Sequence, residues 1–318
     1  MDSHDKEKIL TRMAHILRSD QLKELRHVLE TIDMESSVSN DTLLQRFLDA
    51  KKVEGCSSST IEYYRSTLQR MLSNVKRDLE SITADDLRAY LNRYIEVNKV
   101  SKVTVDNVRR ILSTFFSWLE NEDYILKSPV RKIHRIKTPA LIKETFTDEQ
   151  LEALRDNCQH IRDLSIIDLL ASTGMRIGEL INLNRSDINF EERECVVFGK
   201  GDKERKVYFD ARTKRHLMQY LQSRTDDSTA LFCHLCGNGK RLSKEAIETR
   251  IKHLGEQVDG TRAHPHKFRR TMATLAIDKG MPIEQVQKLL GHTRIETTMH
   301  YAFVDQENVK LSHRKFLA

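Results

Sequence analysis

Along the first 125 residues, apolar side chains recur every three or four positions, which is the spacing of one face of an α-helix. From residue 40 onward the pattern forms four segments, at about 40–52, 59–75, 84–97 and 102–121. Each carries a single apolar stripe and is too short to be stable alone. We therefore expect the four segments to pack together as a small all-α domain.

Residues 1–35 show the same periodicity and predict one or two amphipathic helices, whose role the sequence does not reveal. Two helix starts are marked by capping boxes. Thr83-x-x-Asp86 and Thr147-x-x-Gln150 each place a hydroxyl three residues before a side chain that can bond back to the backbone. Thr147 thus begins the first helix of a second domain.

The second domain is helical with one interruption. A long apolar helix is expected to reach about Ser172, where Thr173-Gly174 ends it, and RIGELINL begins the next helix. Convincing strands lie only between about 188 and 209, where DINF, ECVVF and RKVYF are rich in β-branched and aromatic residues. The predicted fold is mainly α, with a small antiparallel β-sheet in the second of its two domains.

The stretch from 264 to 301 reads as short helices separated by glycine. Pro265 suits the first turn of a helix that Gly280 stops, and Pro282 starts a second helix. Gly291 ends that helix where a left-handed residue is needed, and Tyr301 is expected on a short helix that follows.

These patterns divide the chain into an N-terminal helical extension (1–35), a helical domain (36–127), a linker (128–144) and a second domain with its tail (145–318). The linker sequence SPVRKIHRIKTP is bounded by prolines, which disfavour helix. Its basic residues either keep the linker solvated or lie across a phosphate backbone. The candidates for such DNA contacts are Arg131, Lys132, Arg135 and Lys137.

Composition narrows the class of protein. Of 318 residues 39% are hydrophobic, only four are Pro, and the formal net charge is +6. Residues 36–138 hold 18 basic and 13 acidic side chains, an excess compatible with a polyanionic partner. No apolar run approaches membrane-spanning length, and the start, MDSHDKEK, does not resemble a signal peptide. We expect a cytoplasmic protein with no membrane association.

The five cysteines are odd in number and scattered, which fits reduced thiols. Cys233 and Cys236 have the spacing of half a zinc site, but no second pair of ligands accompanies them. We therefore predict no metal and no cofactor.

The candidate chemistry is attack of a tyrosine hydroxyl on a phosphodiester. The phenol has an ordinary pKa of about 10 and the phosphate is anionic, so clustered cations are needed. Two guanidiniums can hold the non-bridging oxygens through paired donors, and a lysine or histidine can protonate the leaving 5′ oxygen. The residues that could do this are Arg176, Lys200, His266, Arg269, His292 and Tyr301.

Four segments make a specific resemblance: TGMRIGEL, FGKGDKERKV, PHKFRRTMAT and LLGHTRIETTMHY resemble, in order, the signature blocks of the tyrosine recombinase (phage integrase) family. The likeness covers the chain from about 145 onward, while residues 40–125 are similar to the family's core-binding domain by pattern only. It implies an α+β catalytic domain and a site-specific recombinase or integrase. Such an enzyme cuts and rejoins double-stranded DNA through a 3′-phosphotyrosyl intermediate and a Holliday junction.

The resemblance also implies roles for individual residues. Arg176 and Arg269 match the two arginines that clamp the scissile phosphate, and Tyr301 matches the nucleophile. Lys200 matches the hairpin lysine that acts as general acid towards the 5′ oxygen, although Lys203 and Lys206 share its hairpin.

Three further positions match. His266 corresponds to the histidine of the His-x-x-Arg pair, and His292 to a histidine or tryptophan that contacts the phosphate. Glu179 matches a commonly acidic position expected to orient its neighbours. Arg270 departs from the pattern, because many members carry a second histidine there, and this bears on local packing.

Other interpretations stay open. Each candidate taken singly has an ordinary structural role, such as a helix cap, a turn residue or a core side chain. The two helices within 265–290 also resemble a non-catalytic helix-turn-helix regulator, with Gln285, Gln287 and Lys288 facing a major groove. A type IB topoisomerase would use a similar residue set.

The tail after Tyr301, AFVDQENVKLSHRKFLA, contains the apolar residues Val304, Val309, Leu311, Phe316 and Leu317. Family tails of this kind commonly dock on a neighbouring protomer, so the resemblance implies a homotetramer on two DNA sites. The sequence reveals neither the target site nor whether the enzyme resolves chromosome dimers or integrates mobile elements.

Overall fold

The computed structural model describes most of the chain, in the ranges 3–31, 38–137, 144–199, 204–236, 239–258, 261–299 and residue 301. The chain divides into two compact units, residues 1–141 and 142–318. Lys200 and the tail beyond Tyr301 lie outside the described residues.

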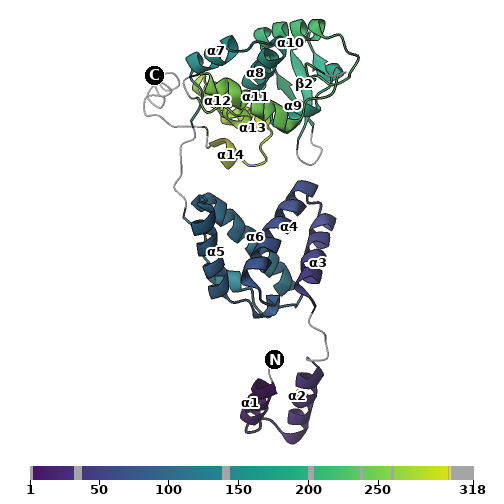
Figure 1. Cartoon of the computed structure of the whole chain (residues 1–318), viewed down its shortest axis with the longest axis vertical. Helices are drawn as coiled ribbons and strands as arrows, with labels where there is room; N and C mark the ends of the chain where they lie inside the picture. Colours follow the sequence, from purple (N-terminus) through teal and green to yellow (C-terminus); the bar gives the residue numbers. More distant parts are fainter. Residues whose placement is uncertain are drawn as a thin grey trace. The chain divides into compact units, whose positions relative to one another are not determined.

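The N-terminal extension forms two helices, α1 (Ser3–Met13) and α2 (Ser19–Thr31), as its periodicity predicts (Figure 1). They pack against each other. Ile16 remains 75% exposed, so this hairpin buries little apolar surface.

The four predicted helical segments are confirmed and surround one apolar core (Figure 1). Its centre contains Phe47, Leu68, Leu112 and Phe115, all fully buried. The predicted capping box at Thr83 is present, with Asp86 bonded back to the Thr83 backbone over 2.9 Å. The elements are α3 (Asn40–Val53), α4 (Ser58–Val75), η1 (Leu79–Ser81), α5 (Ala84–Asn98), α6 (Lys102–Asn121) and η2 (Pro129–Lys132).

The second unit is mainly helical and contains one small sheet, which confirms the predicted fold class. Its first helix starts at the Thr147 capping box, where the Gln150 side chain accepts from the Thr147 backbone over 3.2 Å. The helices are α7 (Asp148–Asp156), α8 (Ile161–Thr173), α9 (Ile177–Asn182), η3 (Arg185–Asp187), α10 (Ala211–Ser223), α11 (Lys244–Glu256), α12 (Pro265–Asp278), α13 (Ile283–Leu290) and α14 (Ile295–Met299).

The sheet is antiparallel with strand order β1-β2-β3. β1 (Ile188–Asn189) is short, and β2 (Glu194–Phe198) pairs with β3 (Glu204–Tyr208) as a hairpin. Cys195 and Val207 are paired and buried, so alternate residues of the hairpin face the core.

Helix α8 is the central element of the unit and packs against α10, α12 and β3. It ends as predicted at Gly174, which has φ +59° and serves as the left-handed cap. Two buried carboxylates on α8 are neutralised by neighbours: Asp163 accepts from Arg250 over 2.6 Å, and Asp168 from Arg155 over 2.7 Å. These contacts hold α8 in place, and its end therefore positions the residues that follow it.

Within the described ranges, no helix is long and apolar enough to cross a membrane. No group of three or more His, Cys, Asp or Glu residues in that part of the chain is placed to hold a metal ion.

Candidate active site

Arg269 lies on α12, which starts at Pro265 and presents Phe268 and Met272 to the interior. The Arg269 side chain is only 3% exposed. Its Nη1 donates to the carbonyl of Gly174 over 2.8 Å, and its Nη2 donates to the carbonyl of Leu290 over 2.6 Å. One guanidinium therefore ties α12 to the ends of α8 and α13.

Arg269 remains charged despite its burial. Desolvation lowers the pKa of Arg269 to about 10, and the positive charges of Arg176 and Arg205 act in the same direction. A pKa of about 10 still leaves the group protonated at neutral pH. The phenol of Tyr301 opposes this lowering, which places it within electrostatic range of Arg269.

His292 follows the left-handed Gly291, whose φ of +64° ends α13 as predicted. Nη2 of Arg269 lies 2.9 Å from Nε2 of His292, and Nδ1 of His292 lies 2.8 Å from the Thr298 hydroxyl. Burial, reinforced by neighbouring guanidiniums, lowers the pKa of His292 to about 4. The imidazole is therefore neutral near pH 7.

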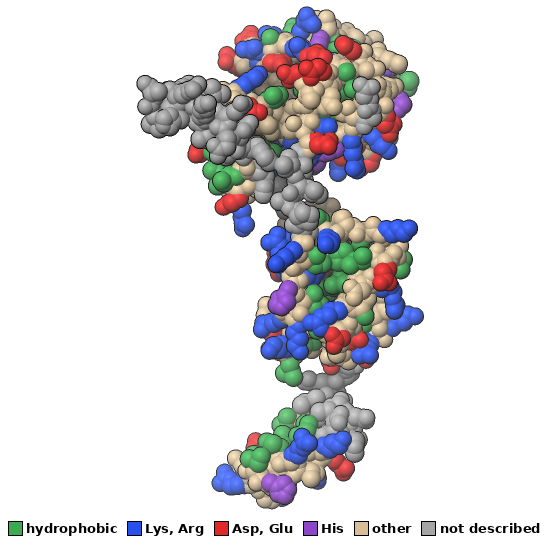
Figure 2. All heavy atoms as spheres, turned by 90° about the vertical axis from the view of Figure 1, so that its left-hand side faces the viewer, with side chains coloured by type: hydrophobic (Ala, Val, Ile, Leu, Met, Phe, Trp, Pro, Cys, Tyr) green, Lys and Arg blue, Asp and Glu red, His purple; other side chains and the backbone are tan. Residues whose placement is uncertain are grey.

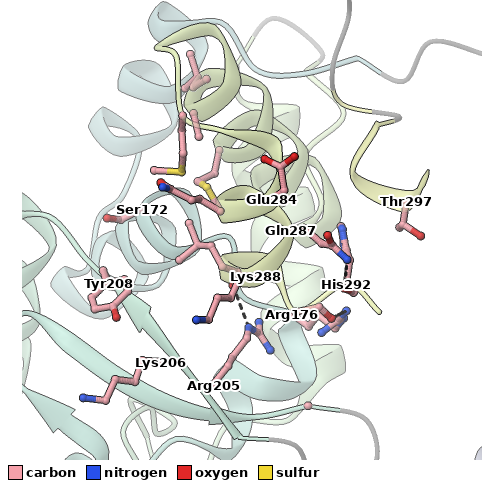
Figure 3. Close-up of a pocket in the computed structure, with 18 of the residues that line it drawn as sticks. Ser172, Arg176, Arg205, Lys206, Tyr208, Glu284, Gln287, Lys288, His292 and Thr297 are labelled. Carbon is pink, nitrogen blue, oxygen red and sulfur yellow. Dashed lines mark hydrogen bonds between the residues drawn. The ribbon is translucent and has the colours of Figure 1, made fainter. Parts of the chain in front are cut away.

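Arg176 stands at the start of α9 and is anchored by Glu179. Nη1 of Arg176 donates to Oε1 of Glu179 over 2.9 Å, and its backbone N–H donates to Oε2 over 2.7 Å. Glu179 is 4% exposed while Arg176 is 37% exposed. The carboxylate therefore holds an arginine that still reaches solvent, beside His292 (Figure 3).

Tyr301 joins this group through its ring. The ring stacks on His292 with centroids 5.9 Å apart and planes 23° apart, and it packs against the apolar cluster of α12 and α13. The expectation that Tyr301 lies on the short helix α14 is wrong. That helix ends at Met299, and Tyr301 sits in the following turn, where its N–H donates to the carbonyl of Thr298 over 2.9 Å.

His266 is exposed on α12, three residues before Arg269. Partial desolvation lowers its pKa, and the charges of Arg269, Arg270 and Arg176 lower it further. Arg270 is explained by local packing, since its Nε and Nη2 donate to the carbonyl of Glu144 over 3.2 and 3.0 Å.

Lys200 cannot be placed, because the hairpin tip at 200–203 lies outside the described residues. The flanking strands β2 and β3 are described, and β3 belongs to the wall of the same site.

The basic linker residues differ from one another. Arg131 pairs with Glu120 over 2.9 Å, whereas Lys132, Arg135 and Lys137 are exposed. The backbone beneath them is fixed to the helical domain, for example by Arg88, which donates to the carbonyl of Lys132 over 2.9 Å.

Sequence reasoning missed Arg205, on β3. Its Nη1 and Nη2 donate to the two carboxylate oxygens of Glu179 over 2.6 and 2.7 Å. A signal was available: the period of two along β3 puts Arg205 on the same side as the buried Val207. A charged residue on a buried face needs a partner of opposite charge.

A groove of about 1380 Å³ opens beside Arg176 and His292, between the hairpin and helices α12 and α13 (Figure 3). Its apolar lining is Met272, Leu275, Ala276, Met281 and Leu289, and its charged lining includes Lys206, Lys279, Lys288, Glu204 and Glu284.

Comparisons with family models give two matches. Residues 144–308 match the phage integrase family, and residues 43–126 match the phage integrase N-terminal SAM-like domain. One matched range lies in each structural unit.

Two similar proteins are named tyrosine recombinases, in agreement with the family matches. Tyrosine recombinase XerD of Proteus mirabilis is 31% identical over 299 residues, covering 87% of this chain and 93% of the relative. Tyrosine recombinase XerC of Staphylococcus aureus (strain bovine RF122 / ET3-1) is 29% identical over 279 residues, covering 84% of this chain and 93% of the relative.

Solved structures share the fold. A lambda integrase dimer bound to a COC′ core site has a TM-score of 0.71 at 20% identity, covering 86% of this chain and 80% of the other. The XerH site-specific recombinase bound to palindromic difH substrate has a TM-score of 0.68 at 21% identity, covering 98% of this chain and 95% of the other. The match to the XerH structure therefore includes part of the N-terminal extension, residues 1–35.

Proposed function

This chain belongs to the phage integrase family and is a site-specific tyrosine recombinase, and we propose that Tyr301 is the nucleophile with which it cuts DNA. The observation that carries the proposal is the clustering of Arg176, Arg269 and Tyr301 around His292, although they come from separate segments of the chain. Arg176 and His292 of this cluster line the groove. One phosphodiester is the substrate that this group fits.

In the proposed reaction the Tyr301 oxygen attacks the scissile phosphorus and loses its proton. The bond from phosphorus to the 5′ oxygen breaks, which leaves a 3′-phosphotyrosyl bond and a free 5′-hydroxyl. Attack of a 5′-hydroxyl from a partner strand reverses the step and restores the tyrosine. A phosphodiester is exchanged for another ester at each step, so strand exchange through a Holliday junction conserves the bond energy.

The two arginines act on the phosphate. Arg176 and Arg269 present planar paired donors to the non-bridging oxygens, and they stabilise the charge that grows on the phosphorane-like transition state. Arg269 is held rigidly by the carbonyls of Gly174 and Leu290. A preorganised donor of this kind needs no reorganisation during the reaction.

The remaining groups are proposed to donate and accept protons. Lys200 is the proposed general acid for the 5′ oxygen, as the family resemblance implies. His266 and His292 are both neutral near pH 7 because desolvation lowers their pKa values, so each can accept as well as donate a proton or hydrogen bond. Glu179 orients Arg176 and takes no direct part.

DNA is the proposed partner of both units. Lys and Arg side chains are spread over the face of the four-helix domain shown in Figure 2. We assign DNA binding to residues 36–127 and the linker 128–144, with 145–318 as the catalytic domain and 1–35 as an extension of unassigned role. The match of residues 43–126 to the family's N-terminal domain supports this division. Lys132, Arg135 and Lys137 are exposed and suit phosphate contacts.

Neither rival function has an observation in its favour. A helix-turn-helix regulator would free Gln287 for base contacts, yet its side chain donates to the carbonyl of His292 over 3.0 Å. The relatives of this chain are named recombinases, which favours strand exchange over the relaxation of supercoils. The cytoplasmic location expected from the sequence fits a DNA substrate and stays a prediction.

We further propose that four copies assemble on two DNA sites and that each tail docks in the groove of a neighbour. The tail begins directly after Tyr301, and the groove is lined by His292 and Thr297, only a few residues earlier. The apolar side chains of the tail match the apolar part of the groove. They include Val304, Val309, Leu311, Phe316 and Leu317.

The nucleophile assignment is tested with a nicked suicide DNA that traps a covalent protein–DNA species. Tyr301→Phe is expected to abolish that species while DNA binding survives. Covalent capture by the Tyr301→Phe variant would exclude Tyr301 as the nucleophile. Sequencing the trapped DNA would also identify the cleaved site.

A further inference from the structure

The side chain of Arg205 crosses from the sheet to two helices (Figure 3). Besides its paired bonds to Glu179, its Nε donates to the carbonyl of Leu289 over 3.0 Å. The Arg205 side chain is 12% exposed and that of Glu179 is 4% exposed. The contact is therefore a desolvated, bidentate pair rather than a surface salt bridge.

Glu179 is saturated by the two arginines. Its Oε1 accepts from Nη1 of Arg176 and Nη1 of Arg205, and its Oε2 accepts from the Arg176 backbone and Nη2 of Arg205. These four donors hold its pKa below the ordinary value, although burial alone would raise it. Glu179 is thus ionised near pH 7, and its carboxylate is held in one orientation.

Arg205 also lies against the backbone that leads to His292. A Cβ placed on Gly291 would come within 2.9 Å of Cδ of Arg205 and within 3.2 Å of its Nε and Nη1. A larger residue at position 291 would force the Arg205 side chain to move, and the φ of +64° at Gly291 favours glycine for a second reason. The guanidinium therefore fixes the last turn of α13 as well as the start of α9.

The charges show why a second arginine is needed. A carboxylate that orients Arg176 would also cancel its charge and weaken its hold on a phosphate. Arg205 offsets that carboxylate. Within the cluster of Arg176, Arg205, Arg269 and Glu179, three guanidiniums then oppose one carboxylate, and His292 beside them is neutral. Two positive charges remain, matching a phosphate that becomes doubly negative in the transition state.

We propose that Arg205 is a positioning residue of the cleavage reaction: it fixes Glu179 and the end of α13 so that Arg176 and His292 face one phosphate, and it neutralises Glu179. The inference rests on the proposed function. It adds a residue that touches neither the phosphate nor the nucleophile and acts through those that do.

The test measures single-turnover cleavage of a suicide substrate by the full chain. Arg205→Gln is expected to cleave roughly 100-fold more slowly, because small misplacements of reacting groups cost about that much. DNA binding is expected to be unchanged. Arg205→Lys keeps the charge but cannot bond both carboxylate oxygens, so it is expected to stay slow.

A second substrate separates charge from position. A methylphosphonate at the scissile position carries no negative charge and needs less positive charge around it. The deficit of Arg205→Gln is expected to shrink on that substrate, while that of Arg205→Lys persists. Equal deficits of the Gln variant on both substrates would overturn the electrostatic part of the proposal.

Arg224→Gln is the matched control for folding. Arg224 is 5% exposed, bonds both oxygens of Asp226 over 2.9 and 2.5 Å, and donates to the carbonyl of Ala230 over 2.6 Å. Its loss is expected to destabilise the unit to a similar extent yet leave cleavage by the folded protein unchanged. If both variants lose cleavage equally when equally folded, Arg205 is merely structural and the proposal fails.

The outcomes also separate this inference from the proposed function. Loss of the covalent species in Tyr301→Phe together with wild-type cleavage in Arg205→Gln would reject the role of Arg205 alone. Covalent capture by Tyr301→Phe would reject the nucleophile itself. If Arg205 acts through Glu179, the double variant Arg205→Gln/Glu179→Gln is expected to raise the activation free energy of cleavage by far less than the sum of the two single effects.

Discussion

Nη2 of Arg269 donates a hydrogen bond to Nε2 of His292 over 2.9 Å. An arginine has no acceptor, so the imidazole nitrogen must accept, and the ring proton must lie on Nδ1, which donates to the Thr298 hydroxyl. His292 is thus held in the tautomer opposite to the one that donates from Nε2 to a phosphate. A bound phosphate would compete with Nε2 for the Arg269 donor.

His292→Ala removes a group that can donate to the phosphate and that aligns Arg269. We expect single-turnover cleavage to fall roughly 100-fold, the effect of losing one oxyanion donor. DNA binding should change little, since most binding energy comes from other phosphates. His253→Ala, an exposed histidine on α11, is the control and should cleave normally. An equal rate in both variants would contradict the assignment.

Arg176→Lys and Arg269→Lys keep the positive charge but lose the paired donors, so both should cleave roughly 100-fold to 1000-fold more slowly. Their stabilities should differ. Arg269→Lys also leaves the carbonyls of Gly174 and Leu290 without their donor, at about 1–3 kcal/mol each at most. Arg176 is 37% exposed, so Arg176→Lys should lower the free energy of unfolding only a little. Urea unfolding beside a cleavage assay checks both statements; normal cleavage by either variant would count against the clamp.

Acid should destabilise the second unit through two half-buried histidines, His264 and His292. Burial lowers the pKa of His264 to about 4, and the charge of Arg270 adds to this. The unfolded value is about 6.5, so between these values the unfolded chain binds a proton that the folded chain refuses. Stability is therefore intact above about pH 6.5 and is lost as the pH falls towards 4. His292, also at about 4, acts in the same direction.

His264→Gln removes one such histidine outside the proposed catalytic set. The free energy of unfolding of the variant should fall less steeply than that of the wild type between pH 6.5 and 4. The difference is at most about 1.4 kcal/mol per pH unit, and less because the ring is only half-buried. Urea titrations at pH 7, 6 and 5 measure both slopes. Identical slopes would show that His264 is not held neutral.

Much of this architecture could be predicted because it depends on local patterns. Helix periods, the capping boxes at Thr83 and Thr147, and the left-handed glycines Gly174 and Gly291 are all encoded within a few residues. The candidate residues themselves were identified by a family resemblance and not by spacing alone. Their meeting in space depends on long-range packing, which no local pattern encodes.

Two features escaped prediction for physical reasons. Arg205 reads as one more basic residue in a basic hairpin, and its role depends on Glu179, 26 positions earlier in the sequence. Tyr301 was placed on a helix because the preceding residues favour one. The helix ends at Met299, and the Tyr301 ring stacks on His292 from a turn instead. In both cases a tertiary contact determines the outcome.

The proposed tail exchange predicts that a truncation after Asp305 separates cleavage from recombination. The truncated chain keeps every proposed catalytic residue, so we expect covalent capture on a single suicide site to persist. Assembly on two sites and strand exchange should be lost, because the tail no longer reaches a neighbour. Native gels of two-site DNA complexes and a recombination assay measure the two activities separately. Full recombination by the truncated chain would exclude an essential tail.

A change in the groove should reproduce that phenotype without touching the tail. Met281, 38% exposed, lines the groove just before α13, and Met281→Arg would put a charge where apolar tail residues should dock. The variant should cleave single sites and fail to assemble pairs, like the truncation. Combining the two changes should cause no further loss, because both remove one contact. Additive losses would mean that the groove binds something other than the tail, with DNA as the first alternative, since Lys206, Lys279 and Lys288 lie in its lining.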